Sequence, residues 1–201
     1  MVYLVGVDEV GRGPIAGPVV ICACAIEEGY DLLYLFPKNK LKDSKKLSEK
    51  NREKIRMALD LLKEEKKVMW GIGEVSAERI DEIGISTAIK EAMTEALMQL
   101  EKEGVSVNTK IVLDGSLYAP ERYINQSTHI KGDEKFVEIS LASIIAKVYR
   151  DTLMKIIAKE LPLYTFENHV GYGTKAHYEA ITAFGITKYH RKSFLKSMNF
   201  E

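Results

Sequence analysis

Short apolar runs and helical periodicities alternate along most of the chain. Residues 2–7 and 18–26 are apolar and rich in β-branched side chains, with a Gly/Pro-rich turn between them, so they predict two strands of a hairpin. Two further apolar runs predict strands at 68–75 and 110–115, and STHI at 127–130 is a candidate for a fifth, shorter strand. Two strands followed by alternating helices and strands favour an α/β domain with a mixed sheet.

Two segments repeat apolar residues every third or fourth position. SEKNREKIRMALDLLKEEKK has apolar residues at i, i+4 and i+7 and begins with Ser48, a plausible N-cap, so it predicts an amphipathic helix. A second amphipathic helix is predicted to begin at Ser86 and to end at Gly104, where glycine favours termination.

The second half of the chain predicts one long helix and then a change of character. Residues 134–160 predict a helix whose middle, ISLASIIAKV, is apolar on nearly every side and should be buried against the sheet. After Pro162 the chain becomes rich in Tyr, His, Gly and Lys. Residues 163–201 therefore predict a small helical appendage, with a helix from about Thr174 to Phe184.

Composition narrows the class of protein. Twenty-nine basic and 29 acidic residues cancel, which argues against a polybasic, non-specific nucleic-acid binder but leaves room for a local basic face. No apolar run approaches the ~20 residues of a membrane span. The start, MVYLVGVDEV, lacks the basic region of a signal peptide. Cys22 and Cys24 would share one strand face as buried thiols, so we expect a reducing, cytoplasmic location.

Four acids lie at the ends of apolar strands or next to the buried helix, where a charged side chain is costly to bury. Asp8 and Glu9 end the first predicted strand, Asp114 ends the strand KIVLD, and Asp133 lies between a short strand and the buried helix. If the first and fourth strands are parallel neighbours, their acids emerge at the same carboxyl edge, where open α/β sheets bind ligands. Adjacent strand residues point to opposite faces, so Asp8 and Glu9 serve one site only if the strand ends or bulges there.

Converging carboxylates repel unless cations offset their charge. Oxygen ligands suit Mg²⁺ or Mn²⁺, and two such ions form the clamp used in phosphodiester hydrolysis. Ordinary alternatives remain open for each acid: Asp114-Gly115 as a turn, Asp133 as a helix N-cap, and Asp8-Glu9 as the polar edge of a hairpin.

The loop GRGPIAGP does not fit the common phosphate-binding fingerprints. A dinucleotide motif needs glycine at position 16, which is Ala16, and no G-K-[ST] follows for a Walker loop. What remains is a loop whose backbone can approach a ligand closely, with Arg12 as a cation suited to a sugar–phosphate backbone. The alternative is a tight turn with a solvated arginine.

Six segments together resemble the ribonuclease HII family, the type 2 ribonucleases H, in its bacterial branch. They are GVDEVGRGPIAGPVV, LKDSKKLS, VLDGS, KGDEKFVEISLASIIAKVYRD, NHVGYGTKAHYEAI and GITKYHRKSF, in the family's order and spacing. Leu141 departs from the family, which usually has a small residue there, and we expect only a change in packing.

The resemblance implies a ribonuclease H-like fold, with a five-stranded mixed sheet flanked by helices and a C-terminal helical segment. We expect residues 1–162 to form the catalytic domain and residues 163–201 to form a substrate-binding segment. The implied activity is endonucleolytic hydrolysis of RNA in RNA–DNA hybrids, and cutting 5′ of single ribonucleotides in duplex DNA, by a two-metal mechanism giving 3′-OH and 5′-phosphate ends. The alternatives are a non-catalytic hybrid-binding module and a phosphatase acting on small esters.

The resemblance also assigns roles to residues. Asp8, Glu9, Asp114 and Asp133 match the family's metal-binding acids, with Mg²⁺ or Mn²⁺ as the ion. The expected substrate contacts are Gly11, Arg12, Gly13, Lys42, Ser44, Lys45, Lys147 and Tyr172. Backbone at the G-R-G sequence would bind the 2′-OH, which is the group that distinguishes RNA from DNA. Tyr172 would pack on a deoxyribose at the RNA-to-DNA junction.

Other side chains receive weaker assignments. Ser140 and Ser143 are expected to be helix packing residues, and Arg150 is expected to pair with Asp151. A further basic patch is predicted at Lys188, His190, Arg191 and Lys192. The four histidines show no metal-ligand spacing. The protein is expected to be a monomer whose partners are RNA–DNA hybrids and ribonucleotide-containing duplexes, with no membrane.

Overall fold

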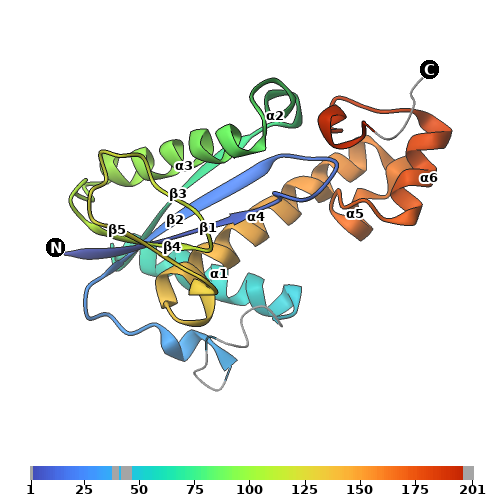
Figure 1. Ribbon diagram of the computed structural model, residues 1–201. Helices are drawn as coiled ribbons and strands as arrows, with labels where there is room; N and C mark the ends of the chain where they lie inside the picture. Colours follow the sequence, from blue (N-terminus) through green and yellow to red (C-terminus); the bar gives the residue numbers. More distant parts are fainter. Residues whose placement is uncertain (1, 38–40, 42–46, 197–201) are drawn as a thin grey trace.

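The computed structural model describes residues 2–37, 41 and 47–196. A five-stranded sheet forms its centre, in the order β3-β2-β1-β4-β5 (Figure 1). The strands are β1 (Tyr3–Val10), β2 (Val19–Glu27), β3 (Val68–Val75), β4 (Lys110–Asp114) and β5 (Gln126–His129). The β1–β2 and β2–β3 pairs are antiparallel, whereas the β1–β4 and β4–β5 pairs are parallel. The mixed five-stranded sheet and its hairpin are therefore confirmed.

Helices cover both faces of this sheet. In Figure 1, α2 and α3 lie on one side of the strands, and α1 and α4 lie on the other. The α-helices are α1 (Glu49–Glu64), α2 (Ala77–Ile83), α3 (Ile85–Lys102), α4 (Val137–Glu160), α5 (Phe166–His169) and α6 (Lys175–Phe184). The 3₁₀ turns are η1 (Leu33–Leu35), η4 (Gly132–Glu134), η5 (Pro162–Tyr164) and η6 (Lys192–Phe194). Within the described ranges, none of the helices has the length and apolar character needed to cross a membrane.

Most predicted boundaries hold to within a few residues. Ser48 caps α1 by accepting a hydrogen bond from Asn51 N, and Thr174 caps α6. The short helix α2 was not predicted, because its seven residues are too few to show a clear helical repeat of apolar positions. Gly84, at φ 77°, ends α2 and lets α3 begin immediately afterwards.

The first strand is longer than predicted. It does not end before Asp8 but continues to Val10, with Asp8 opposite Cys22 and Glu9 opposite Ile21. Its pairing with β4 stops at Val7, so the acids lie in a part of β1 that only β2 borders. The sequence prediction ended the strand before the acids because acids are uncommon in strands. In the structure, β2 stays paired with β1 through Val10.

The two main core clusters lie on opposite faces of the sheet. Val5, Val7 and Leu113 belong to the cluster under α3, whereas Cys22 and Cys24 belong to the cluster under α1 and α4. Both cysteines are free and buried, as predicted. Leu141 is fully buried in the second cluster, so its effect is one of packing.

Close packing of α4 on β1 depends on one glycine. A Cβ on Gly6 would lie 2.2 Å from the backbone carbon of Glu138, a distance that no side chain permits. Because Gly6 is two residues before Asp8, this close approach brings the first half of α4 next to the acids.

The C-terminal segment has its own cluster, which lies beyond the end of the sheet (Figure 1). It contains Phe166 and Ile181 from the segment itself, Met154 from α4, and Ile15 and Ala16 from the loop between β1 and β2. A β-bridge joins Ala16 to His190. The appendage is thus built around the loop that follows the first two acids.

Candidate metal and substrate site

Strand register places the acids of β1 and β4 beside each other. Val7 pairs with Leu113 in the parallel ladder, so the next residues along the two strands are Asp8 and Asp114. Val7 and Leu113 point into the core under α3, and alternation therefore turns Asp8 and Asp114 toward α4. The predicted parallel neighbourhood of these strands is confirmed.

The segment that carries Asp133 is held against Asp114. The Oδ1 atom of Asp114 accepts a 2.6 Å hydrogen bond from Gly132 N. The space around Gly132 is tight: a Cβ there would lie 2.6 Å from Cδ1 of Ile139, so the Ile139 side chain would have to shift. Asp133 follows directly and is 1% exposed. The chain thus delivers a third acidic segment to the edge formed by β1 and β4.

Burial and like charges dominate the electrostatics of this edge. Burial, together with the charges of Asp114 and Glu9, raises the pKa of Asp8 to about 8, against the lowering effect of a hydrogen bond from the Ser143 side chain. Burial also raises the pKa of Glu9, against the lowering effect of Arg12, which lies 3.5 Å away. Ser143 therefore contacts Asp8, and its assignment as a packing residue alone was wrong; Ser140 is fully buried, as expected of packing.

The donor set fits hard divalent cations. All four candidate ligands are carboxylates, and the raised pKa values of Asp8 and Glu9 come first from burial and then from neighbouring acids, both of which a bound cation would offset. Among the described side chains, however, no three His, Cys, Asp or Glu groups are arranged closely enough to hold a metal ion as they stand. Asp8, Glu9 and Asp114 lie close enough for their charges to interact, and Asp133 follows the residue whose backbone binds Asp114. The strand end or bulge that would turn Asp8 and Glu9 to one face is absent, because β1 stays in register with β2 through Val10, so the two side chains leave the strand on opposite faces.

The two glycines around Arg12 differ in their surroundings. Gly11, at φ 84°, is buried, and a Cβ there would lie 2.2 Å from Nε of Arg150. Gly13 has no atom within 4 Å of such a Cβ, so its backbone is open to a ligand. Arg12 is half exposed and lines a pocket of about 130 Å³ together with Lys90. Only the second half of the G-R-G sequence therefore faces outward.

A buried arginine that we did not predict as a site residue holds this loop. Arg191 is fully buried, and its guanidinium donates to the carbonyl oxygens of Gly11, Arg12 and Gly17 at 2.6, 3.0 and 3.0 Å. Burial and the nearby Arg150 lower the pKa of Arg191 to about 9. The predicted basic patch is thus wrong in part, because His190 and Arg191 are buried while Lys188 and Lys192 are exposed.

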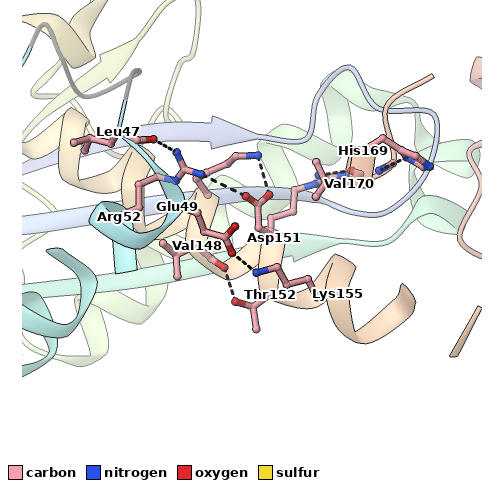
Figure 2. Close-up of polar contacts among 12 residues, drawn as sticks. Leu47, Glu49, Arg52, Val148, Asp151, Thr152, Lys155, His169 and Val170 are labelled. Carbon is pink, nitrogen blue, oxygen red and sulfur yellow. Dashed lines mark hydrogen bonds and ion pairs between the residues drawn. The ribbon is translucent and has the colours of Figure 1, made fainter. Parts of the chain in front are cut away.

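The predicted pair of Arg150 with Asp151 is also wrong. Asp151 instead accepts from Lys147 at 2.8 Å and lies 3.9 Å from Arg52. Figure 2 shows Arg52 between Asp151 and the carbonyl oxygen of Leu47, which ties α1 to α4. Neighbouring residues on a helix point in different directions, so Arg150 faces the loops and Asp151 faces α1.

The other predicted substrate contacts divide into two groups. Lys147 lies one helical turn after Ser143 and is partly exposed, and its ammonium donates to Asp151 at 2.8 Å. Its role as a substrate contact stays a prediction. Lys42, Ser44 and Lys45 lie outside the described residues. Their role as substrate contacts stays a prediction.

Tyr172 lies on an exposed loop, as predicted, with 47% of its surface accessible. Its carbonyl oxygen is held by a chain of buried histidines. Thr187 N donates to Nδ1 of His190 at 2.9 Å, and His190 Nε2 lies 3.1 Å from His177 Nε2. His177 Nδ1 in turn lies 2.8 Å from the Tyr172 oxygen. His190 therefore donates to His177, which donates to the carbonyl of Tyr172.

Desolvation keeps this histidine pair neutral. Burial is the largest cause that lowers the pKa values of His177 and His190 to about 4; His169 contributes to both values, and His177 contributes to that of His190. The ring of His169 stacks on His177 with centroids 4.3 Å apart. Sequence spacing gave no sign of this cluster, because its members meet only when the C-terminal segment folds.

Comparisons with known proteins agree with this architecture. The family model described as Ribonuclease HII matches residues 5–197. A protein named Ribonuclease HII from Chlamydia caviae is 48% identical over 191 residues, covering 95% of this chain and 83% of the relative. Another with that name, from Bacillus thuringiensis, is 44% identical over 194 residues, covering 96% and 69%.

Solved structures give the same answer for the fold. A chain from the PCNA:RNase HII complex of Archaeoglobus fulgidus aligns with a TM-score of 0.73 at 26% identity, covering 94% of both chains. Bst-RNase HIII in complex with Mn²⁺ aligns with a TM-score of 0.65 at 17% identity, covering 98% of this chain and 70% of the other, which supports the fold alone.

The family match spans the sheet, the acids and the C-terminal segment together. Ribonuclease HII enzymes are metal-dependent endoribonucleases that cleave RNA in RNA–DNA hybrids and at single ribonucleotides. With the family model covering nearly the whole sequence, this chain belongs to the ribonuclease HII family.

Proposed function

We propose that this chain hydrolyses RNA in RNA–DNA hybrids, and cuts 5′ of single ribonucleotides in duplex DNA, at a site formed by Asp8, Glu9, Asp114 and Asp133. The observation that carries the assignment is the neighbouring position of Asp8 and Asp114 at the carboxyl ends of parallel strands. Their charges interact, and burial raises the pKa of Asp8 to about 8. The expected products end in 3′-OH and 5′-phosphate groups.

These carboxylates would hold Mg²⁺ or Mn²⁺, two ions with substrate bound. Bound ions of this kind supply a hydroxide near neutral pH and stabilise negative charge on the leaving oxygen. The protein contributes orientation: Ser143 hydrogen-bonds Asp8, and Gly132 N fixes one oxygen of Asp114. Asp8 interacts with the charges of both Asp114 and Glu9, so it is the residue that we propose would contribute to holding both ions.

Two loops would recognise the substrate. The open backbone of Gly13 and the half-exposed Arg12 favour contact with the 2′-OH and the sugar–phosphate backbone. The exposed ring of Tyr172 favours packing on a deoxyribose, where a 2′-OH would clash. We assign residues 163–201 to substrate binding for this reason, and Lys42, Ser44, Lys45 and Lys147 to phosphate contacts. The active unit is proposed to be a cytoplasmic monomer.

Cleavage of a DNA duplex that contains one ribonucleotide tests the proposal directly. We expect cutting on the 5′ side of the ribonucleotide with Mg²⁺ or Mn²⁺, and none with a chelator. An intact duplex in the presence of both metals would contradict the assignment. A duplex that is bound but never cut would instead support the alternative, a non-catalytic hybrid-binding module.

A further inference from the structure

A buried arginine on α4 connects the two loops that we assign to substrate recognition. Arg150 is fully buried, and its guanidinium donates to three carbonyl oxygens. Nε and Nη2 donate to Pro18 and Ala16 at 2.9 and 3.1 Å, in the loop that begins with Gly11. Nη1 donates to Val170 at 2.9 Å, two residues before Tyr172. One planar group thus fixes two segments that are far apart in the sequence.

The same two loops also contact each other through their backbones. Ile15 N and Ala16 N both donate to the carbonyl oxygen of Gly171, at 2.9 and 3.1 Å. Gly171 has φ 88°, and a Cβ there would lie 2.2 Å from the oxygen of Ala16. The two loops therefore meet without space for a side chain between them. Their separation is fixed by this backbone contact and by the hydrogen bonds of Arg150.

Arg150 has an unusual set of partners for a buried cation. Among the described residues, its recorded hydrogen bonds go only to backbone carbonyls, and no carboxylate lies within ion-pair distance of it. Burial accordingly lowers the pKa of its guanidinium. A buried charge without a counter-ion is costly. What Arg150 provides, and an apolar side chain would not, is three hydrogen bonds that join two loops. A lysine cannot reproduce them, because its ammonium is a point donor without a planar fork.

We infer that Arg150 is a positioning residue that sets the distance between the Gly11–Gly13 turn and Tyr172, and thereby the preference for a single ribonucleotide followed by DNA over a uniform RNA–DNA hybrid. This inference rests on the proposed function of the two loops. A single ribonucleotide requires both loops to bind adjacent nucleotides at once. A uniform hybrid presents a 2′-OH at every position and gains less from the deoxyribose contact of Tyr172.

Arg191 supplies a matched control for this role. It is equally buried and also donates to three carbonyls, but all three belong to the loop between β1 and β2. Its loss should disturb recognition of the 2′-OH in every substrate without changing the distance to Tyr172 specifically. The two arginines therefore separate a general effect on the loop from an effect on the spacing of the loops.

The experiment compares Arg150→Lys and Arg191→Lys by kcat/KM on two substrates, a DNA duplex with one ribonucleotide and a uniform RNA–DNA hybrid. We expect Arg150→Lys to lower the ratio of the two values about tenfold, which is less than the ~100-fold cost that a misplacement of about 1 Å can have. Arg191→Lys should lower both values by similar factors. An unchanged ratio in Arg150→Lys, or an equal change of ratio in both variants, would overturn the inference.

A double variant tests whether Arg150 acts through Tyr172. In a Tyr172→Ala background, where the ratio is already reduced, Arg150→Lys should lower it no further. Additive losses would contradict the inference. If Arg150→Lys is unfolded by circular dichroism, Gly171→Ala decides, because its Cβ would push the same loops apart and should lower the same ratio. A wild-type protein that cuts neither substrate would refute the proposed function instead.

Discussion

The sheet edge that carries the acids and the cluster around the C-terminal segment treat buried polar groups in opposite ways. At the sheet edge, Asp8 is buried beside two other carboxylates, and its pKa is raised to about 8. In the C-terminal cluster, Arg150 and Arg191 satisfy their donors with six carbonyl oxygens in total, and the histidines His177 and His190 are neutral. In the first region, ionisation of Asp8 is unfavourable unless an added ion offsets its charge. In the second region, the guanidinium nitrogens and the histidine rings find their hydrogen-bond partners within the protein.

The difference corresponds to two tasks: the sheet edge is proposed to bind cations, and the C-terminal cluster holds loops in place. A region that must bind cations cannot also neutralise its own ligands, and it therefore sacrifices stability in their absence. A region that must hold loops at fixed spacing gains from complete hydrogen bonding, because each lost bond would leave a buried group unsatisfied. Variants that remove charge should consequently affect the two regions in opposite directions.

The largest effect is expected from Asp8→Asn. Turnover of the single-ribonucleotide duplex should fall at least about 10³-fold, because a neutral amide does not hold divalent ions well. In the metal-free protein the free energy of unfolding should not decrease, because burial and the charges of Asp114 and Glu9 already oppose ionisation of this carboxyl, and asparagine is neutral. Steady-state kinetics and urea unfolding measure the two quantities.

Asp151→Asn is the control for that variant. Asp151 is also a largely buried acid, but it pairs with Lys147 and Arg52. Its loss leaves two cations without their partner, so stability should decrease. A stability loss in Asp8→Asn as large as that of Asp151→Asn would show that the acids at the sheet edge are not under electrostatic strain.

The histidine pair should make stability fall in acid. His177 and His190 have folded pKa values of about 4, below the 6.5 expected in the unfolded chain. Between these values the unfolded state binds more protons, so stability is fully present above pH 6.5 and is lost as pH falls toward 4. The loss is on the order of 3 kcal/mol for each histidine. Urea unfolding across this pH range measures it.

A variant in which both histidines are replaced by glutamine sharpens that result. It is expected to be less stable at pH 7, but its stability should change less between pH 6.5 and 4.5 than that of the wild type. The slope is the readout, because lost packing alone lowers stability at every pH equally. Equal slopes in the two proteins would show that another group titrates.

Divalent ions should stabilise the sheet edge and leave the C-terminal cluster unaffected. Mg²⁺ or Mn²⁺ at a hundredfold excess over its dissociation constant should stabilise the wild type by about 2.7 kcal/mol. Asp8→Asn should lose most of this shift, whereas the double glutamine variant should keep it. Thermal unfolding with metal and with chelator measures the shifts without relying on activity. A full shift in Asp8→Asn would remove that residue from the metal site.

Sequence patterns predicted the elements of both regions better than their internal contacts. Apolar runs located four of the five strands, and acids directly after two of these runs pointed to Asp8 and Asp114. The fifth strand, β5, is the polar sequence QSTH and was only a candidate. The carbonyl contacts of Arg150 and Arg191 left no local signal. An arginine beside an aspartate suggests an ion pair, and only the folded loops reveal that its partners are backbone oxygens from distant segments.

The smallest effect is expected at two serines that lie three residues apart on α4. The Ser143 side chain hydrogen-bonds Asp8 and opposes the rise of its pKa, whereas Ser140 Oγ is buried without a hydrogen-bond partner among the described residues. Ser143→Ala should lower turnover severalfold and move the acid limb of the pH–rate profile to higher pH, because the carboxylate loses a donor. Ser140→Ala should leave turnover unchanged and stability equal or up to about 1 kcal/mol higher, since it removes an unsatisfied hydroxyl. Both variants remove one oxygen from the same helix, so the difference between their pH profiles isolates the contact with Asp8. Identical profiles would mean that Ser143 only packs, and that the charge at the sheet edge is not adjusted from α4.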